Sequence, residues 1–135
     1  MERIEQVDLN RALEAEYPLT QAVRIGNLIF VSGQIALDRE GKIVGENDLA
    51  AQCKKCFENL GEVLEAAGAT FKDLVKLTSF FTADITDPAV VRTYFDVREA
   101  YLGSHKPASS GVQVKSLIYP GLLLEMDAIA VLPHT

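Results

Sequence analysis

The most informative candidate for chemistry is Glu125, which lies between Leu124 and Met126 in a nearly continuous apolar stretch. A carboxylate in such surroundings needs a partner, or else burial raises its pKa. In a cleft, such a group could act as a general acid or base, or hold a water molecule. The alternative is a strand face exposed to solvent. Asp127 on the same face supports this alternative, and the residues alone slightly favour it.

Two short polar segments could hold a ligand. Ser32–Gln34 closes a very apolar strand, and a hydroxyl beside the bare backbone of Gly33 would let a ligand approach closely. The alternative, a strand end with a turn glycine, is about equally supported. Residues 107–111 read Pro-Ala-Ser-Ser-Gly, whose hydroxyls and amides could hold an anion or a carbonyl group. A plain loop-to-strand junction is the simpler interpretation of this second segment.

The cysteines and histidines indicate no redox or metal site. Cys53 and Cys56 form a Cys-x-x-Cys string, but they lie inside an amphipathic pattern that predicts buried helix thiols rather than a redox or zinc site. His105 falls in a predicted loop, and His134 is close to the C-terminal end. Solvated histidines are the simpler interpretation, so we expect no metal site.

Composition narrows the possible classes of protein. The chain has 135 residues, 48% of them hydrophobic, which predicts one domain over 1–135 with a sizeable core. Its apolar runs are too short to span a bilayer, and no secretory signal is visible, so we expect a cytoplasmic protein with reduced thiols. The net charge of −6, without a basic run, argues against binding to nucleic acid or to a membrane.

The hydrophobic pattern predicts alternating strands and helices. Apolar runs joined by Gly26-Asn27 predict a tight hairpin, and a second hairpin is predicted through Gly41. Apolar spacing of three and four residues predicts a helix that begins after an Asn47 N-cap and ends at Gly68. Further elements are predicted at 74–82 (strand), 88–102 (helix), 110–118 (strand) and 122–132 (strand). Residues 1–19 are the least regular part, although Ile4 and Val7 could lie in a first strand.

This element order predicts an α+β fold in which two helices cover one face of a mixed sheet. The strand at 122–132 alternates, with Leu124, Met126 and Ala128 on one face and Ile129 on the other. Apolar residues therefore occupy both faces of the sheet. We expect the second face to be buried against another copy of the chain.

Several of these segments together resemble the RidA/YjgF family, also called endoribonuclease L-PSP or enamine/imine deaminase. The resemblance covers nearly the whole chain from about Pro18. Its most specific parts are the Val-Ser-Gly-Gln-Ile block at 31–35 and the late glutamate; the other matching stretches are 20–23, 26–31, 59–68, 75–80, 107–108 and 124–131. It implies a two-layer, chorismate-mutase-like fold, assembled as a homotrimer with clefts between subunits.

The resemblance also implies a chemistry. Family members hydrolyse reactive enamines and imines, such as 2-aminoacrylate, to a keto acid and ammonia, without a cofactor. An arginine after Pro-Ala grips the substrate carboxylate, while the late glutamate and a backbone carbonyl hold the attacking water. A Ser-Gly strand end and an upstream tyrosine complete the pocket. The positions that match are Ser32, Gly33, Phe80 and Glu125.

Other positions depart from the family pattern. Ser109 replaces the arginine, Gly111 replaces a cysteine, and Leu19 stands at the tyrosine position, with Tyr17 nearby. A bidentate contact from arginine to a carboxylate contributes about 1.5 to 3 kcal/mol, which a serine cannot supply. We therefore predict weak or no activity on 2-aminoacrylate. Arg92, which aligns with a family asparagine, could supply a cation for a longer, dicarboxylate substrate, although a solvated helix arginine is the simpler interpretation.

Three functions follow from this pattern. The leading one is a hydrolase of altered specificity, with Glu125 as the catalytic residue and a small-molecule substrate. Its predicted substrate-binding residues are Ser32, Gly33, Phe80, Arg92, Ser109, Ser110 and Gly111. The second is a trimer that binds a metabolite or a protein without turnover. The third is a ribonuclease, against which the acidic charge counts.

Overall fold

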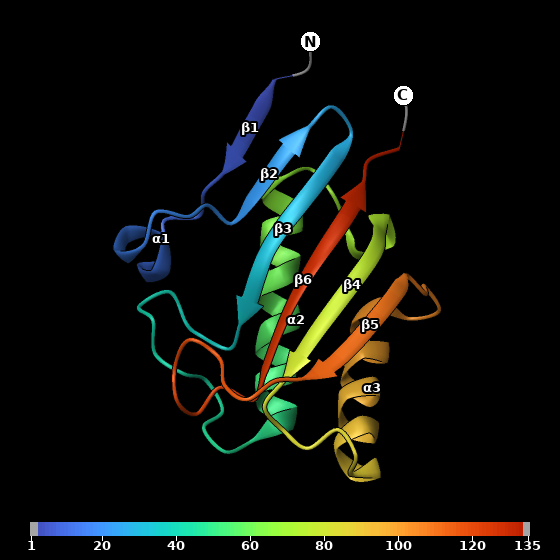
Figure 1. Ribbon diagram of the computed structural model, residues 1–135. Coiled ribbons are helices and arrows are strands. Elements are labelled where there is room, and N and C mark those ends of the chain that lie inside the picture. Colours follow the sequence, from blue (N-terminus) through green and yellow to red (C-terminus); the bar gives the residue numbers. More distant parts are fainter. Residues whose placement is uncertain (1–2, 134–135) are drawn as a thin grey trace.

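Two long helices pack against one face of a six-stranded sheet in the computed structural model, which describes residues 3–133 (Figure 1). The strands are β1 (Ile4–Val7), β2 (Ala22–Ile25), β3 (Leu28–Ile35), β4 (Leu74–Phe81), β5 (Ala108–Gln113) and β6 (Leu124–Val131). The helices are the short α1 (Ala12–Glu16), α2 (Leu49–Ala66) and α3 (Pro88–Leu102), with a 3₁₀ turn, η1, at Phe71–Asp73. The predicted α+β class is confirmed.

The strand order is β1-β2-β3-β6-β4-β5, so the C-terminal strand lies in the middle of the sheet. All neighbours are antiparallel except β4 and β5, which are parallel. A parallel pair needs a crossover connection, and α3 provides it between these two strands. This crossover places α3 beside α2, with a cavity between α3 and β5.

The core lies between the sheet and α2. Every second residue of β6 faces the helices and is buried, from Leu124 to Ala130. Phe57 and Leu60 of α2 are fully buried against this layer. As predicted, the alternate residues of β6, Glu125 among them, point to the opposite face, which no helix of the described residues covers (Figure 1).

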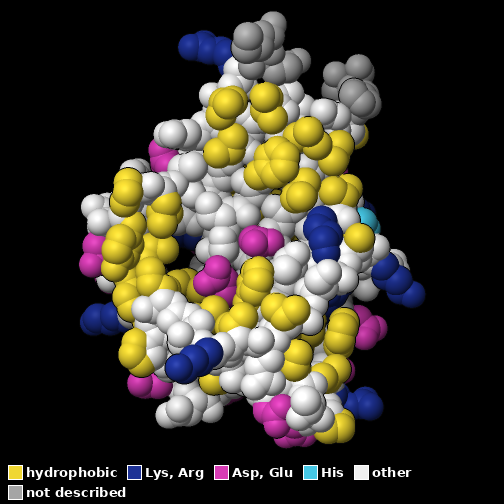
Figure 2. Space-filling view, in the orientation of Figure 1, with side chains coloured by type: hydrophobic (Ala, Val, Ile, Leu, Met, Phe, Trp, Pro, Cys, Tyr) yellow, Lys and Arg dark blue, Asp and Glu magenta, His cyan; other side chains and the backbone are white. Residues whose placement is uncertain are grey.

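The uncovered face of the sheet carries cross-strand rows of apolar side chains. Ile25, Leu28 and Val131 are register neighbours in one row, and Val23, Phe30 and Ile129 in the next. Phe30 is 44% exposed and Leu28 39% exposed. The space-filling view shows apolar patches on this face beside acidic side chains in a central hollow (Figure 2). Such an exposed apolar area is typical of a contact surface.

Three details of the predicted elements were wrong: a hairpin, an N-cap and a strand end. The second hairpin is reduced to an isolated bridge between Leu37 and Ile43, although the turn at Gly41 has the expected positive φ of 89°. The N-cap of α2 is Asp48, whose side chain accepts a hydrogen bond from the Ala51 amide, because Asn47 takes a left-handed conformation. The strand expected at 110–118 ends at Gln113, because its partner strand β4 ends at the paired Phe81.

The N-terminal segment is held by a buried arginine. Arg11, just before α1, donates to the Gln34 side chain at 2.7 Å and to the Asn59 carbonyl at 3.2 Å. It also forms an ion pair with Glu62 of α2 at 2.8 Å. Because a buried guanidinium is costly without partners, these bonds fix α1 and the strand end at Gln34 to α2.

Candidate functional site

Four of the predicted site residues lie together on the uncovered sheet face. Phe80 of β4 is the direct cross-strand neighbour of Glu125. Pairing between β3 and β6 jumps from Val31–Ala128 to Gln34–Met126, so Ser32 and Gly33 form a β-bulge beside Glu125. A bulge lifts the backbone out of the regular ladder, as is frequent next to active sites. The bulge therefore brings Gly33 up to the carboxylate.

Gly33 and Glu125 are in such close contact that any larger residue at position 33 would displace the carboxylate. A Cβ atom on Gly33 would overlap Oε2 of Glu125 and lie 2.7 Å from its Cδ. The φ angle of Gly33 is not in the left-handed region. The glycine is thus required for the space it leaves to the carboxylate, and not for backbone conformation.

The Glu125 carboxylate has no hydrogen-bond or ion-pair partner among residues 3–133. Burial raises its pKa above the ordinary value, and the nearby charge of Asp127 raises it further. Burial also raises the pKa of Asp127, while Lys76 acts in the opposite direction. A half-buried carboxylate with free lone pairs and a raised pKa is suited to hold a water molecule and exchange a proton with it.

The hydroxyl of Ser32 has a structural role. It donates to the Thr20 carbonyl at 2.6 Å, and the Ser32 amide donates to the Gln21 carbonyl at 2.9 Å. These bonds fix the bulge to the segment before β2. The hydroxyl can still accept a hydrogen bond from a ligand, but its proton is already used. Tyr17, near the family's tyrosine position, is hydrogen-bonded to Tyr119.

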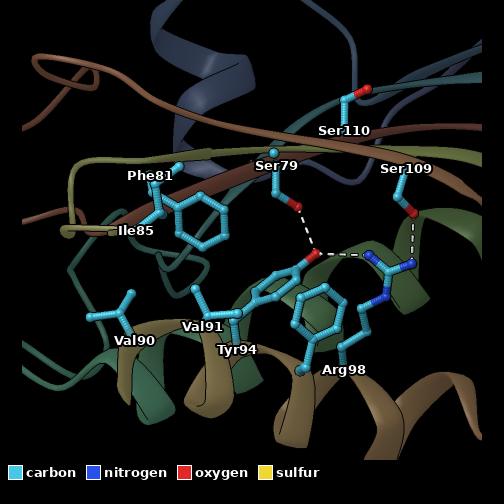
Figure 3. Close-up of a pocket in the computed structure, with 11 residues that line it drawn as sticks. Ser79, Phe81, Ile85, Val90, Val91, Tyr94, Arg98, Ser109 and Ser110 are labelled. Atoms are coloured by element: carbon cyan, nitrogen blue, oxygen red, sulfur yellow. Dashed lines mark hydrogen bonds between the residues drawn. The ribbon is translucent and has the colours of Figure 1, made fainter. Parts of the chain in front are cut away.

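Ser109 and Gly111 belong to a second group of residues, on the helix side of β5. Both line a cavity of about 290 Å³ between β4, β5 and α3. Within one chain the sheet therefore separates them from Glu125. Ser110 alternates to the uncovered face, where its hydroxyl accepts a hydrogen bond from Lys76 at 2.9 Å; in Figure 3 its hydroxyl points away from the cavity.

Arg98 of α3 occupies the polar end of this cavity, and our sequence analysis missed it. Its guanidinium donates to the Ser109 hydroxyl at 2.6 Å and to the Tyr94 hydroxyl at 3.2 Å. Tyr94 in turn shares a 2.7 Å hydrogen bond with the buried Ser79 (Figure 3). The signal was available: Tyr94 and Arg98 are four residues apart, which places both on one helix face.

Arg92, the cation that the sequence suggested, lies elsewhere on α3. Its side chain is exposed and lines a separate, more open hollow with Phe95 and Asp96. It does not line the cavity that contains Ser109. Of the two arginines, Arg98 alone contacts the predicted substrate-binding residues.

The cysteines and histidines form no site in the part of the chain that is described. Burial raises the pKa of Cys53 to about 12, and that of the fully buried Cys56 also lies well above its ordinary value. Both thiols therefore stay protonated and unreactive. His105 is hydrogen-bonded to the Leu74 carbonyl at 2.8 Å, and His134 lies outside the described residues.

No cluster of three metal-ligating side chains occurs within residues 3–133. None of the helices in this range is long and apolar enough to cross a membrane. Neither observation adds a candidate to the two groups of residues described above.

Comparisons with known proteins agree with the resemblance seen in the sequence. The family model described as Endoribonuclease L-PSP matches residues 9–132. A RutC family protein of Pyrococcus abyssi is 40% identical over 113 residues, which cover 84% of this chain and 85% of the relative. The human protein named 2-iminobutanoate/2-iminopropanoate deaminase is 34% identical over 114 residues, which cover 84% of this chain and 80% of that protein.

Solved structures share the same fold. The crystal structure of a Mycobacterium tuberculosis member of the YjgF/YER057c/UK114 family has a TM-score of 0.80 at 30% identity. The match covers 96% of this chain and 100% of that one. The arrangement of strands and helices described above is thus a known one.

Proposed function

Because the chain belongs to the Endoribonuclease L-PSP family, that of the RidA and YjgF proteins, we propose that it hydrolyses a small 2-imino acid to a 2-oxo acid and ammonia. A relative named 2-iminobutanoate/2-iminopropanoate deaminase supports this reaction class. We propose further that the substrate differs from those of members that carry the family arginine, because Ser109 stands at that position.

One observation carries the proposal: Glu125 is a half-buried carboxylate without a hydrogen-bond or ion-pair partner among residues 3–133, set against the bare backbone of Gly33. A carboxylate that only stabilised the fold would be expected to have hydrogen-bond donors around it. Its free lone pairs and raised pKa instead suit a base that binds water.

The proposed reaction proceeds in two steps. Glu125 accepts a proton from the bound water as the water oxygen attacks the imine carbon, and it passes this proton to the nitrogen as the C=N double bond becomes single. The resulting carbinolamine then loses ammonia as its C–N bond breaks. Its hydroxyl proton leaves as the C=O double bond forms, and Glu125 can carry that proton to the departing nitrogen. Overall, one water is consumed, and no cofactor is needed.

A complete site requires two copies of the chain. Glu125 lies on the uncovered sheet face, whereas Ser109 and its cavity lie on the helix side of the edge strand β5. The apolar rows beside Glu125 supply a surface for a neighbouring copy. We propose a homotrimer in which the uncovered face of one copy adjoins the cavity of the next.

The test is hydrolysis of imino acids, generated in place by an amino acid oxidase from a panel of amino acids, with 2-oxo acid formation as the readout. Glu125→Gln should reduce kcat/KM by about 10²- to 10⁴-fold, the usual contribution of a general acid or base. Calorimetric binding of the 2-oxo acid product should change little. Wild-type protein that fails to accelerate hydrolysis of any imine would contradict the proposal and favour a binding protein.

The Glu125→Gln variant should not lose activity through unfolding. The folded state raises the pKa of Glu125, so the stability that this group supplies is present below its ordinary pKa and is lost as the pH rises through the raised value. At pH 7 the substitution therefore removes an unfavourable charge. Thermal unfolding at pH 7 should give a Tm equal to or above that of the wild type.

A further inference from the structure

The cavity between β5 and α3 has a polar end and an apolar end (Figure 3). A hydrogen-bonded chain runs along the polar end from Ser79 through Tyr94 and Arg98 to Ser109. Apolar side chains line the remainder: Phe81, Ile85, Val90, Val91 and Phe95. Such a combination fits a ligand with one charged group and a hydrocarbon part.

The hydrogen bonds of Arg98 fix the orientation of its guanidinium, but they do not neutralise its positive charge. Two of its N–H groups are bound to uncharged hydroxyls, those of Tyr94 and Ser109, and no carboxylate lies within ion-pair distance among residues 3–133. Its guanidinium carbon lies 5.4 Å from the centroid of the Phe95 ring, which further restricts its position. A guanidinium has five N–H donors, so donors remain for an anion.

We propose that Arg98 binds the carboxylate of the substrate and that the apolar end of the cavity accepts its side chain. This inference rests on the proposed function and specifies its substrate class: 2-imino acids with a branched or aromatic hydrocarbon side chain. Arg98, which lies on α3, thus supplies the positive charge that the serine at position 109 cannot supply. The hydroxyl of Ser109 accepts from Arg98 and helps to hold the guanidinium in place.

The size and charge of the cavity favour a monocarboxylate. Its 290 Å³ lies at the lower end of the range for small-molecule sites, about 300–1,000 Å³. Arg98 is the one cationic side chain among the residues that line it, which matches one negative charge. A second carboxylate would have to enter the apolar end, where desolvation is costly.

The test is calorimetric titration with 4-methyl-2-oxopentanoate, the 2-oxo acid product expected from a branched 2-imino acid. Arg98→Gln should weaken binding roughly 10- to 100-fold, as expected for loss of a charge-assisted contact. Arg98→Lys keeps the positive charge but lacks the planar, two-pronged donor group of arginine. Its affinity should lie between those of the wild type and Arg98→Gln, and it provides a second variant should the first fail to fold. Arg92→Gln, on the same helix but outside the cavity, should bind as the wild type does.

A second variant tests the apolar end. A Cβ on Gly111 would lie 3.5 Å from Phe81 Cε2, an ordinary contact, so position 111 has room for a Cβ, and the longer side chain of Gly111→Val should reduce the cavity. It should weaken binding of 4-methyl-2-oxopentanoate about 10-fold or more and change binding of pyruvate less than 2-fold.

Three outcomes would overturn the inference: no binding by the wild type at millimolar ligand, equal binding by Arg98→Gln, or loss in Arg92→Gln alone. Because 2-oxo acids bind without turnover, these results are independent of imine hydrolysis. A chain that binds them through Arg98 but hydrolyses no imine would refute the proposed function and leave Arg98 as the carboxylate site of a binding protein.

Discussion

At the scale of single residues, the candidate site depends on one close contact, that between Gly33 and Glu125. The contact explains why a glycine without a positive φ is required, since a Cβ would occupy the place of the carboxylate. The sequence identified both residues. It could not show that they touch, because the contact depends on a bulge between strands that are about 90 positions apart.

Gly33→Ala should therefore displace the Glu125 carboxylate without unfolding the protein, because the overlapping atoms are the end of a flexible side chain. We expect kcat/KM for imine hydrolysis to fall about 10- to 100-fold, since small misplacements of a catalytic group are costly. In the Glu125→Gln background the same change should cause little further loss. An equal loss in both backgrounds would show that Gly33 acts in some other way.

The pH dependence of kcat/KM should depend on the charge of Asp127. Only the deprotonated Glu125 can accept a proton from water, so kcat/KM should rise with pH through the raised pKa of Glu125. The charge of Asp127 is one cause of this raised pKa, so Asp127→Asn should move the acidic limb to lower pH. Glu46→Gln, at an exposed carboxylate, is the control. An unchanged limb in Asp127→Asn would mean that Glu125 does not set it.

At the scale of elements, the pattern predicted which helices and strands exist better than where they end. The helix signals were local: Asp87 caps α3, Pro88 is its first residue and Gly103 ends it. Strand ends were harder to predict, because they depend on the partner strand. The strand after Pro107 stops at Gln113 for lack of a partner beyond Phe81, which no local pattern encodes.

The N-cap of α2 gives a prediction at this scale. Asp48 Oδ1 accepts the Ala51 amide at 3.1 Å, and loss of an aspartate cap typically costs about 0.5–2 kcal/mol. Asp48→Ala should lower the free energy of unfolding in denaturant by about 1 kcal/mol and leave kcat/KM unchanged. Glu46→Ala should be neutral. A larger effect in Glu46→Ala than in Asp48→Ala would contradict the assigned cap.

At the scale of the whole molecule, the sequence correctly indicated an apolar second sheet face, but it did not show that the predicted site residues lie on two sides of the sheet. Ser32 and Glu125 share the uncovered face, whereas Ser109 lies on the helix side of β5. The sheet face on which each β5 side chain lies depends on the register between β5 and β4. No local sequence pattern determines this register. The proposed site therefore combines Glu125 of one copy with Arg98 of another.

Co-expression of two inactive variants, Glu125→Gln and Arg98→Gln, tests this shared site most directly. Mixed assemblies, isolated through a different tag on each variant, are assayed for imine hydrolysis. In a cyclic trimer that contains both variants, about one site in three pairs an intact Glu125 with an intact Arg98 from the neighbouring copy. A site shared between neighbouring copies should therefore recover about one third of wild-type activity. Mixed assemblies as inactive as either parent would contradict it.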